Sequence, residues 1–551
     1  MVRHNSNRPY GVAAAPGAAA IKTIRRLCVA LSLLTLLGAC ASLPPGSHYP
    51  KAHSEALSDG TSTRLSQEIA VTVRNHAGRS GFRIINVGVD GFLMRLEMIN
   101  AAERTLDLQY FIFREDESGH LLSDALVKAA DRGVRIRILV DDGDTVTGDE
   151  QLLALSGHAA IEIRVFNPFA YRGHSKLIRG TEYLLRHARL DYRMHNKLFV
   201  ADNAIALTGG RNVGDQYFQI DPASQFADDD VFVVGSITQK LSAEFDEYWN
   251  SALAIPAEAL RHRGAQGYVA SANGDYTAAR QQKVSKAGFD YRDKLAHGEP
   301  LASVLAGQQP LIWADAQVVY DSPDKKPVVA GALAGSLMYE PLANDVKDVQ
   351  SELLVATPYL IPTKGEMRLL EERREHGVRV RILTNSLEAA PDKAAHAGYM
   401  HYRGPLLKDG VELYEVRSLL GSTRGSGESV TVSRYGNYAL HGKIFVMDRE
   451  KLYIGSMNFD QRSRRLNTEM GLIINSADLS QQMATRFEAM VQKKNAYTVA
   501  LRSHNGRNPS GLVWQTDESG TAVEYQSEPA RSDWQKFAVK ILTLLPLDPE
   551  L

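Results

Sequence analysis

Two stretches of this chain decide its fold, HNKLFVADNAIALTGGRN (residues 195–212) and HGKIFVMDREKLYIGSMN (residues 441–458). Both follow one pattern, His-x-Lys-x4-Asp-x6-Gly-x-x-Asn. With 16 histidines in 551 residues, one His-x-Lys-x4-Asp is expected roughly 0.05 times by chance. Two copies with the same trailing glycine and asparagine therefore indicate a duplicated unit that carries one chemistry.

The positions shared by the two copies are polar groups and turn residues. They are His195, Lys197, Asp202, Gly209 and Asn212, and then His441, Lys443, Asp448, Gly455 and Asn458. An apolar, strand-like run follows each lysine, at residues 198–200 and 444–446. Because alternate residues of a strand share a face, the histidine and the lysine of each copy point the same way.

The segments before the two motifs repeat as well. We expect helix, strand, helix and strand over residues 92–104, 105–113, 119–132 and 133–140, and strand, helix and strand over 351–362, 364–376 and 377–383. Gly133 and Gly377 lie 244 positions apart, and His195 and His441 lie 246 apart. This near-constant offset indicates two homologous halves. The predicted fold class is α/β, with two α-β-α halves related by pseudo-twofold symmetry and mixed sheets flanked by helices.

We divide the chain accordingly. Residues 1–39 form an export leader, 40–77 a tether, 78–255 the first half, 256–335 a mostly helical connector, 336–500 the second half and 501–551 a C-terminal tail. The tail ends in an apolar cluster at residues 537–547 beside Lys536 and Lys540. Two interpretations stay open: a helix in a membrane interface, or a terminal helix packed on the core.

The N-terminus has the pattern of an export signal. Lys22, Arg25 and Arg26 precede the apolar run at 27–37, which is short for a transmembrane helix. The run ends in Leu-Gly-Ala-Cys40, which resembles a bacterial lipobox and implies lipidation of Cys40. A buried apolar helix that happens to end in cysteine is the alternative. The resemblance implies an exported lipoprotein that faces the periplasm and passes to the outer membrane.

Composition sets further limits. A chain with 44% hydrophobic and 23% charged residues is globular, with a sizeable core. Its formal net charge of −1 provides no basic field of the kind that draws proteins onto nucleic acid, so no nucleic-acid partner is expected. Of the two cysteines, Cys28 lies in the leader and Cys40 is the lipidation site, which leaves no disulfide.

Two such halves meeting across a pseudo-twofold axis would gather two imidazoles and two ammonium groups around one cavity, a receptor for a phosphate diester. Its cleavage requires a nucleophile, a proton for the departing oxygen and positive charge for the transition state. Histidine can serve both of the first two roles. The lysines, with Asn212 and Asn458, would hold the nonbridging oxygens, and Asp228 and Glu469 would orient the opposite imidazoles.

The motif aspartates complete the catalytic set, which is His195, Lys197, Asp202, His441, Lys443 and Asp448. Asp202 and Asp448 lie after the strand and off its histidine and lysine face. We therefore expect these two carboxylates to brace their turns more than to act in the chemistry.

The doubled His-x-Lys-x4-Asp resembles the phospholipase D superfamily, over about residues 80–500. Four stretches resemble bacterial cardiolipin synthases of the C type in particular: LDLQYFI (106–112), RMHNK (193–197), HAGY (396–399) with Tyr402 and Arg403, and GVELYE (410–415). The resemblance implies an enzyme without metal or other cofactor that works through a covalent phosphohistidine. It also implies acceptor contacts from His396, Tyr399 and Tyr402.

The resemblance further implies that His195 is the nucleophile and His441 the general acid, although the residues alone allow the two to be exchanged. Gly210 stands where the second copy has Ser456, which indicates unequal roles for the two halves.

The leading functional hypothesis is a phosphatidyltransferase that moves a phosphatidyl group from one phospholipid to the hydroxyl of another. A phospholipase D hydrolase that releases phosphatidic acid is the alternative, because the intermediate is the same and only the acceptor differs. A periplasmic nuclease and an inactive lipid-binding lipoprotein fit less well. We expect a monomer that acts on phospholipids at a bacterial membrane surface, and leave an accessory protein open.

Overall fold

The computed structural model of the chain describes residues 44–58, 62–143, 154–173, 175–221, 224–260, 300–419, 438–502 and 511–544. The predicted leader and the predicted lipidation site at Cys40 lie outside these ranges. None of the helices within them has the length and apolar character needed to cross a membrane.

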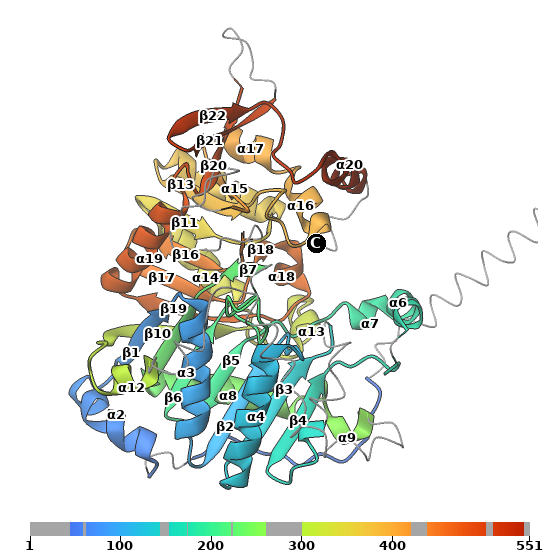
Figure 1. Cartoon of the computed structure of the whole chain (residues 1–551), viewed down its shortest axis with the longest axis vertical. Coiled ribbons are helices and arrows are strands. Elements are labelled where there is room, and N and C mark those ends of the chain that lie inside the picture. Colours follow the sequence, from blue (N-terminus) through green and yellow to red (C-terminus); the bar gives the residue numbers. More distant parts are fainter. Residues whose placement is uncertain are drawn as a thin grey trace, which may run out of the picture.

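One sheet of 18 strands runs through the molecule (Figure 1). Its first part follows the order β9 (Ala254–Pro256), β4 (Ile161–Phe166), β3 (Arg135–Asp141), β2 (Thr105–Tyr110), β5 (Leu198–Ala201), β6 (Ile205–Gly209), β8 (Asp230–Gly235) and β1 (Ser80–Ile85). The second part follows as β10 (Ile312–Tyr320), β19 (Met470–Asn475), β17 (Lys451–Gly455), β16 (Ile444–Met447), β11 (Glu352–Ala356), β13 (Arg379–Asn385), β14 (Glu412–Val416) and β20 (Ala496–Leu501), and ends with β21 (Leu512–Glu518) and β22 (Thr521–Tyr525).

This order reads the same from the centre outward in both directions. β1 and β10 pair antiparallel at the centre, with Gly81 opposite Trp313. On either side come an antiparallel set and then three parallel strands, β2, β3 and β4 in one half and β11, β13 and β14 in the other. The mixed sheets and the pseudo-twofold symmetry predicted from the repeat are confirmed.

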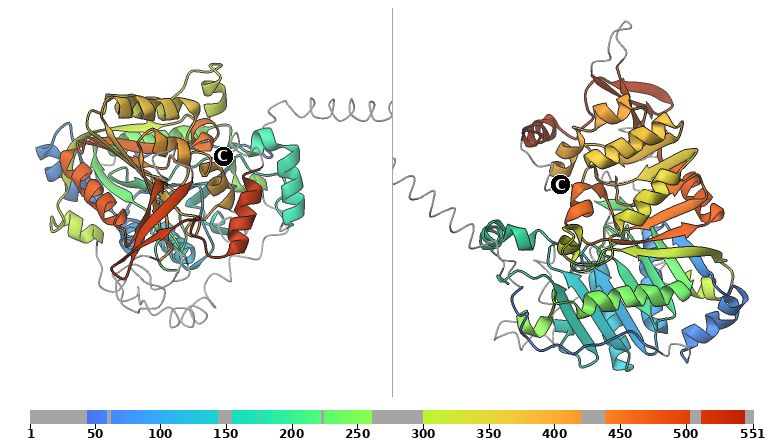
Figure 2. Two further views of the ribbon diagram at one scale, coloured as in Figure 1. Left: turned by 90° about the horizontal axis from the view of Figure 1, so that it is seen from above. Right: turned by 180° about the vertical axis from the view of Figure 1, so that it is seen from behind.

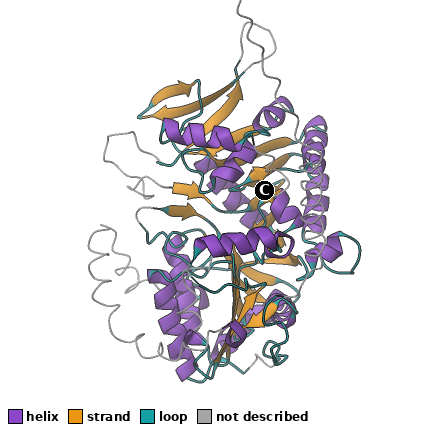
Figure 3. Ribbon diagram, turned by 90° about the vertical axis from the view of Figure 1, so that its right-hand side faces the viewer, coloured by secondary structure: helices purple, strands orange, loops and turns teal. Residues whose placement is uncertain are grey.

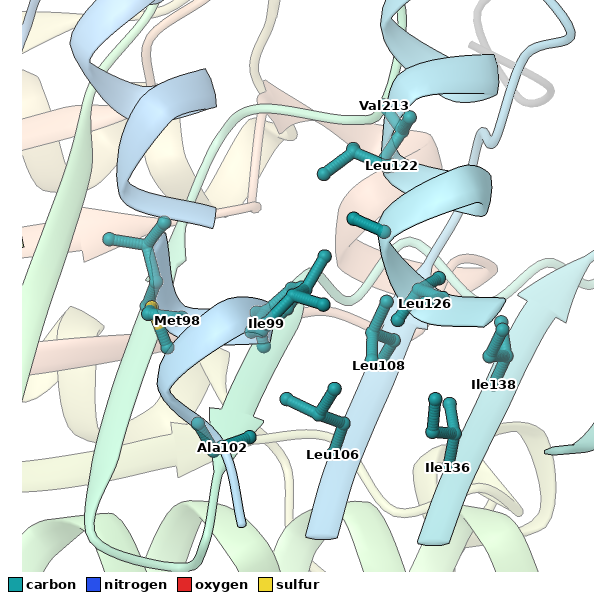
Figure 4. Close-up of a cluster of buried hydrophobic side chains, with 14 of the residues drawn as sticks. Met98, Ile99, Ala102, Leu106, Leu108, Leu122, Leu126, Ile136, Ile138 and Val213 are labelled. Carbon is teal, nitrogen blue, oxygen red and sulfur yellow. The ribbon is translucent and has the colours of Figure 1, made fainter. Parts of the chain in front are cut away.

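Helices α3 (Gly88–Ala101) and α4 (Glu117–Asp131) cover one face of the first half of the sheet. Figure 4 shows Leu106 and Leu108 of β2 pointing toward these helices, beside Ile136 and Ile138 of β3. Alternation along the strands turns Asp107 and its polar neighbours to the other face, as a period of two requires.

In the second half, α14 (Tyr339–Asp348), α15 (Lys364–Glu375) and α17 (Arg403–Lys408) enclose the equivalent core. Helices α8 (Ser236–Asn250) and α19 (Ala477–Met490) pack against a third cluster that draws residues from both halves. A core shared in this way fixes the two halves against each other.

Turn and cap chemistry ends the equivalent helices in equivalent ways. Gly133 and Gly377 follow α4 and α15 with φ of +93° and +83°, the left-handed region in which glycine closes a helix without a Cβ penalty. Thr363 begins α15 with a capping box that includes Glu366. Two glycines that lie 244 positions apart therefore end equivalent helices in the two halves.

The remaining elements lie around this framework. The helices are α2 (Arg64–Asn75), α6 (Lys176–Leu185), α7 (His187–Leu190), α9 (Ala257–Leu260), α12 (Pro300–Leu305), α13 (Lys325–Val329), α16 (Lys393–Tyr399), α18 (Gln461–Arg465) and α20 (Asp533–Leu542). Two small parallel sheets pair β7 (Gln225–Ala227) with β15 (Tyr438–Leu440), and β12 (Leu360–Ile361) with β18 (Phe459–Asp460). The β7–β15 pair joins the two halves directly.

Several predicted boundaries differ from the structure. The sequence predicts a mostly helical connector over 256–335. Its residues 261–299 lie outside the described ranges, and its residues 312–320 form β10, the counterpart of β1 at the start of the second half. The expected strand over 351–362 is divided into β11 and β12. β10 was not visible in the motif repeat, because β1 and β10 share no polar signature.

The ends of the two halves also differ from the prediction. The tail contributes the hairpin β21–β22, which extends the sheet beyond β20. Part of the predicted tether lies on the first half, where the backbone carbonyl of Ser54 accepts a hydrogen bond from buried Arg137. Both segments therefore belong to the folded unit.

Candidate active site

The two motifs meet where the halves join. The backbone N–H of His195 donates to the carbonyl of Thr468 at 2.8 Å, and that of His441 donates to the carbonyl of Ala227 at 2.7 Å. Thr468 and Ala227 immediately precede Glu469 and Asp228. Each histidine is thus held by backbone beside the acidic residue of the opposite half.

The side chains complete the same exchange. His195 Nδ1 lies 2.8 Å from Glu469 Oε2, and His441 Nδ1 lies 2.5 Å from Asp228 Oδ2. The structure places the two acids beside the opposite imidazoles, and their orienting role stays a prediction. A charged carboxylate only accepts hydrogen bonds, so the network assigns the hydrogen to Nδ1 of each ring and leaves Nε2 as its basic nitrogen.

Both motif lysines lie in this cluster and are buried. Lys443 Nζ lies 2.9 Å from His441 Nδ1 and 3.3 Å from His441 Nε2, and Lys197 donates to the backbone carbonyl of His195. The charge of each lysine acts on both histidines. The four groups predicted to surround one cavity are therefore in electrostatic contact.

Burial is the main reason why the pKa of both imidazoles is lowered, and the neighbouring lysines lower it further. The pKa of His195 is well below its usual value, and that of His441 is lowered to about 3. Both rings are neutral at neutral pH in the substrate-free site. A neutral imidazole retains the lone pair that a nucleophile or base requires.

The pKa values of the two lysines and the two acids are shifted as well. Burial lowers the pKa of Lys443 to about 8 and that of Lys197 well below its usual value. Burial also raises the pKa of Glu469. For Asp228 burial acts upward too, but the hydrogen bond from His441 and the charges of Lys443 and Arg211 outweigh it, and the net pKa is lowered. Asp228 is thus held as an anion more firmly than Glu469.

The motif asparagines each bring a buried amide to this region. Asn212 Oδ1 accepts from the backbone N–H of Ile112 at 3.2 Å. Its Nδ2, and Oδ1 of Asn458, have no hydrogen-bond partner among the residues described. Since the oxygen and nitrogen of an amide exchange by a flip, both asparagines can present an N–H to an incoming oxygen atom.

The motif glycines are required by close backbone approach. A Cβ at Gly209, where φ is +152°, would lie 2.4 Å from the carbonyl oxygen of Asp229. A Cβ at Gly455 would lie 2.5 Å from the carbonyl oxygen of Met470. Glycine here lets β6 and β17 approach the segments that carry the two acids.

The motif aspartates hold the neighbouring strands. The carboxylate of Asp202 accepts hydrogen bonds from the backbone N–H groups of residues 103–105, at the start of β2. Asp448 does the same for residues 350–352, at the start of β11. Each lies beyond a four-residue strand from its motif lysine. These contacts anchor the motifs and support no direct chemical role.

Two positioning residues were missed by the sequence analysis. Asp141 ends β3 and accepts from the backbone N–H of Met194 at 2.8 Å, and Asn385 ends β13 and accepts from that of Leu440 at 2.8 Å. Met194 and Leu440 directly precede the two histidines. Asp141 and Asn385 lie 244 positions apart, the offset of Gly133 and Gly377, so the repeat contained the signal that could have found them.

Aromatic rings enclose the imidazoles. The ring centre of Phe111 lies 5.0 Å from that of His195, and the ring centres of Tyr217 and Phe226 lie 5.1 and 5.0 Å from that of His441. The histidines are only 6% and 7% exposed. These walls limit the access of water to the reacting groups.

The three residues expected to contact the acceptor do not lie together. His396 and Tyr399 line a small cavity that also includes Asn385. Their polar atoms bond to acids, His396 Nε2 to Glu528 at 2.7 Å and Tyr399 to Glu415 at 3.0 Å. Tyr402 lines a different cavity of about 620 Å³, with basic residues around it. An acceptor role for any of them stays a prediction.

Comparison with known families agrees with this geometry. The family described as "Cardiolipin synthase, PLD-like domain" matches the chain twice, at residues 96–249 and 342–491. Cardiolipin synthase C of Escherichia coli (strain K12) is 33% identical over 497 residues, which cover 88% of this chain and 99% of that protein. The major cardiolipin synthase of Bacillus subtilis (strain 168) is 25% identical over 430 residues, 76% of this chain and 71% of that protein.

Among solved structures, phosphatidylserine synthase from Haemophilus influenzae Rd KW20 is 13% identical, with a TM-score of 0.52, and the match covers 88% of this chain and 100% of that one. This similarity concerns the fold. Together with the two matched domains and the paired motifs, it leads to one conclusion. The chain belongs to the phospholipase D superfamily, with two PLD-like domains in one polypeptide, and it is an enzyme that acts on phosphodiester bonds.

Proposed function

We propose that this enzyme is a phosphatidyltransferase that moves a phosphatidyl group from one phospholipid to a hydroxyl of another, as in cardiolipin synthesis. The observation that carries the proposal is the crossed pairing of each imidazole with an acid of the opposite half, around two buried lysines. The names of the relatives in Escherichia coli and Bacillus subtilis support the choice of substrate class.

In the first step, Nε2 of His195 attacks the phosphorus of the donor lipid. The bond from phosphorus to the headgroup oxygen breaks, and that oxygen takes a proton from Nε2 of His441. Lys197, Lys443 and the two motif asparagines hold the nonbridging oxygens, where negative charge develops. The product of this step is a phosphatidyl group on His195 and a free headgroup alcohol.

The proton for the leaving oxygen comes from the pair of His441 and Lys443. Lys443 Nζ lies 3.3 Å from His441 Nε2, and its pKa of about 8 keeps one proton on the pair at neutral pH. The negative charge of a bound diester raises the pKa of His441, so that the proton can pass through its ring. Asp228, a firm anion, stabilises the imidazolium that forms.

The unequal acids support the assignment of roles. A general acid cycles through a charged imidazolium and benefits most from a firmly anionic partner, which His441 has in Asp228. Glu469, whose pKa burial raises, pairs with His195. This arrangement favours His195 as the nucleophile and His441 as the acid and later the base.

In the second step, the acceptor hydroxyl gives its proton to Nε2 of His441 and attacks phosphorus. The bond between phosphorus and His195 breaks, and the phosphatidyl group leaves on the acceptor. The aromatic walls around both rings support an alcohol as acceptor over water, because a lipid hydroxyl enters a dry site together with its own apolar chains.

The test uses the purified full chain with phosphatidylglycerol vesicles and mass spectrometry of the lipid products. We expect cardiolipin and free glycerol from wild type and neither from His195→Ala. Phosphatidic acid as the main product would instead establish a hydrolase. A DNA-cleavage assay beside it would reveal a nuclease, and identical lipids with both proteins would indicate a binding protein.

We also propose that the chain is exported, lipidated at Cys40 and held at the outer membrane with its site facing the periplasm. The support is the lipobox-like sequence Leu-Gly-Ala-Cys40. Mass spectrometry of the protein from separated membranes would test this proposal. We expect a lipid-modified Cys40 at the mature N-terminus in the outer-membrane fraction. An unmodified N-terminus at Met1 would contradict it.

A further inference from the structure

Helix α6 has its polar face turned toward the protein. Arg179 pairs with Asp142, and Glu182 accepts hydrogen bonds from the backbone N–H groups of Ala170 and Tyr171, both at 2.8 Å. In an ordinary surface helix of a globular protein the charged residues face water and the apolar ones face the core. The arrangement in α6 is the reverse.

The apolar side chains of α6 face outward. Leu177, Leu184 and Leu185 are 81%, 78% and 78% exposed, and Ile178 is 49% exposed. Positions separated by seven or eight residues share one face of a helix, so these four form a continuous stripe. Four large apolar side chains on one short helix exceed the scattered exposure that a soluble surface normally shows.

Helix α20 carries a second stripe. It packs on α16 through Val539, in a cluster with Leu387 and Ala397. Its opposite side exposes Trp534, Phe537, Ile541 and, one turn later, Leu544. The sequence leaves two interpretations of this segment open, a helix in a membrane interface and a terminal helix packed on the core. One face of α20 packs on α16, and the other exposes the apolar stripe.

The two helices that carry these stripes lie on one side of the molecule. α6 and α20 project on the right in Figure 1, and on the same side as each other in both views of Figure 2. Figure 3 looks onto this side. They supply eight of the thirteen large hydrophobic side chains that are exposed among the described residues. One comes from the first half of the chain and the other from its end, so the surface spans both halves.

We propose that α6 and α20 together form a docking surface for a phospholipid bilayer. The proposal rests on the proposed function, because phospholipid substrates lie in a bilayer and the enzyme must reach them there. The charge of the helices fits an anionic leaflet: Lys176 and Arg186 flank the α6 stripe, and Lys536 and Lys540 lie on α20 beside one acid, Asp533. Apolar stripes flanked by basic residues are the composition of interfacial helices.

Both helices connect to segments of the site. α7 follows α6 and ends at Leu190, five positions before His195. Asp191, between them, accepts a hydrogen bond at Oδ1 from Nη1 of Arg462 in α18 at 2.6 Å. α20 packs on α16, whose His396 and Tyr399 line the small cavity with Asn385. Docking through these helices would therefore hold the bilayer next to the elements that carry both motifs.

The first test measures depth. Single cysteines at Leu184, Phe537 and Val71, in the full chain with Cys28→Ser and Cys40→Ser, receive an environment-sensitive fluorophore. Val71 is the matched control, an exposed apolar residue on α2 on the opposite side in Figure 1. With vesicles of phosphatidylethanolamine and phosphatidylglycerol that contain brominated lipid, we expect quenching at 184 and 537 and none at 71. Equal signals at the three positions, or quenching at only one helix, would overturn the proposal.

The second test measures activity. Leu184→Ser with Leu185→Ser, and Phe537→Ser with Ile541→Ser, should each reduce turnover of lipid in vesicles by at least about tenfold, because apolar contact with the bilayer is lost. Turnover of a monomeric short-chain phospholipid should be unchanged. An equal loss on both substrates, or no loss on either, would contradict docking. If wild type has no transferase activity, the proposed function fails, while quenching still reports docking by itself.

Discussion

The two halves place a histidine in the same position but surround it differently. Glu469, beside His195, accepts hydrogen bonds from Ser456 at 2.5 Å and from Ser463 at 2.8 Å. Asp228, beside His441, is one methylene shorter and lies against Gly210, where a Cβ would be 2.0 Å from its Oδ1. The duplicated halves therefore carry equivalent imidazoles, and the different residues around each ring give the two rings different electrostatic surroundings.

The residues that hold the backbone just before each histidine differ as well. Asp141 and Asn385 hold the residues before the two histidines in the same geometry. Burial raises the pKa of Asp141 to about 6, against the opposing charge of Arg193, whereas Asn385 is neutral. One half therefore has an additional titrating group behind its histidine.

The largest expected effect comes from removing either ring. His195→Ala and His441→Ala should each reduce transfer by roughly 10⁴-fold or more, because nucleophile and general acid act in one sequence of steps. Lipid turnover by mass spectrometry measures the loss, and circular dichroism verifies that the fold persists. A variant that kept a tenth of the activity would show that the two halves do not share one reaction.

Replacing each acid with its amide should distinguish the roles of the two halves. We expect Asp228→Asn to reduce kcat by about 10³-fold and Glu469→Gln by about 10²-fold, because Asp228 is the firmer anion and stabilises a charged imidazole. Both substitutions preserve shape, so each is the control of the other. Equal losses would remove the electrostatic distinction between the dyads.

The small residue beside each acid should matter in one half more than in the other. Gly210→Ser places a Cβ 2.0 Å from Asp228 Oδ1 and should cost roughly 10²-fold in kcat. Ser456→Gly removes one hydrogen bond to Glu469 and should cost about tenfold. Steady-state kinetics at saturating lipid compares the two, and Gly210→Ser at wild-type rate would contradict the close approach.

The pH profile should reflect Lys443. Burial lowers its pKa to about 8, so the lysine loses its charge and the pair with His441 loses its proton as pH rises through that value. We expect kcat/KM to decrease by about tenfold per pH unit above it. Lys443→Arg, which remains charged, should lower the rate but move this alkaline limb upward. An unmoved limb would assign it to another group.

The smallest expected effect is that of a chelator. The resemblance to the phospholipase D superfamily implies a reaction without metal, so EDTA should leave lipid turnover unchanged. Activity measured after dialysis against EDTA, with and without added divalent cations, provides the test. A loss that Mg²⁺ or Ca²⁺ restores would overturn this part of the mechanism.

Much of the fold followed from repeated patterns. The duplicated motif and the paired glycines were sufficient for the two halves, their symmetry and the family, because alternation and turn residues are local properties of the chain. β10 was missed, since its alternation carries no motif and a strand at a pseudo-twofold axis is recognised only by its two neighbours. The hairpin β21–β22 was missed because its strands carry no repeated motif.

The site was predictable in its members more than in its surroundings. Asp228 and Glu469 could be assigned to the opposite imidazoles because both follow the motif asparagines at a short distance. Asp141 and Asn385 act through backbone contacts, and the signal that could have indicated them was their 244-residue offset rather than their residue types. The apolar stripe of α6 shows the same limit, because periodicity identifies a helix with two faces and does not say which of them faces the core.

The most direct test of unequal roles is to trap the covalent intermediate. A phosphatidyl ester of p-nitrophenol needs no general acid, so His441→Ala should still release p-nitrophenol once and retain the phosphatidyl group on His195, detectable by peptide mass spectrometry. His195→Ala should form no adduct. A phosphatidyl group on His441 in the His195→Ala protein, or no adduct on His195 in the other, would contradict the account.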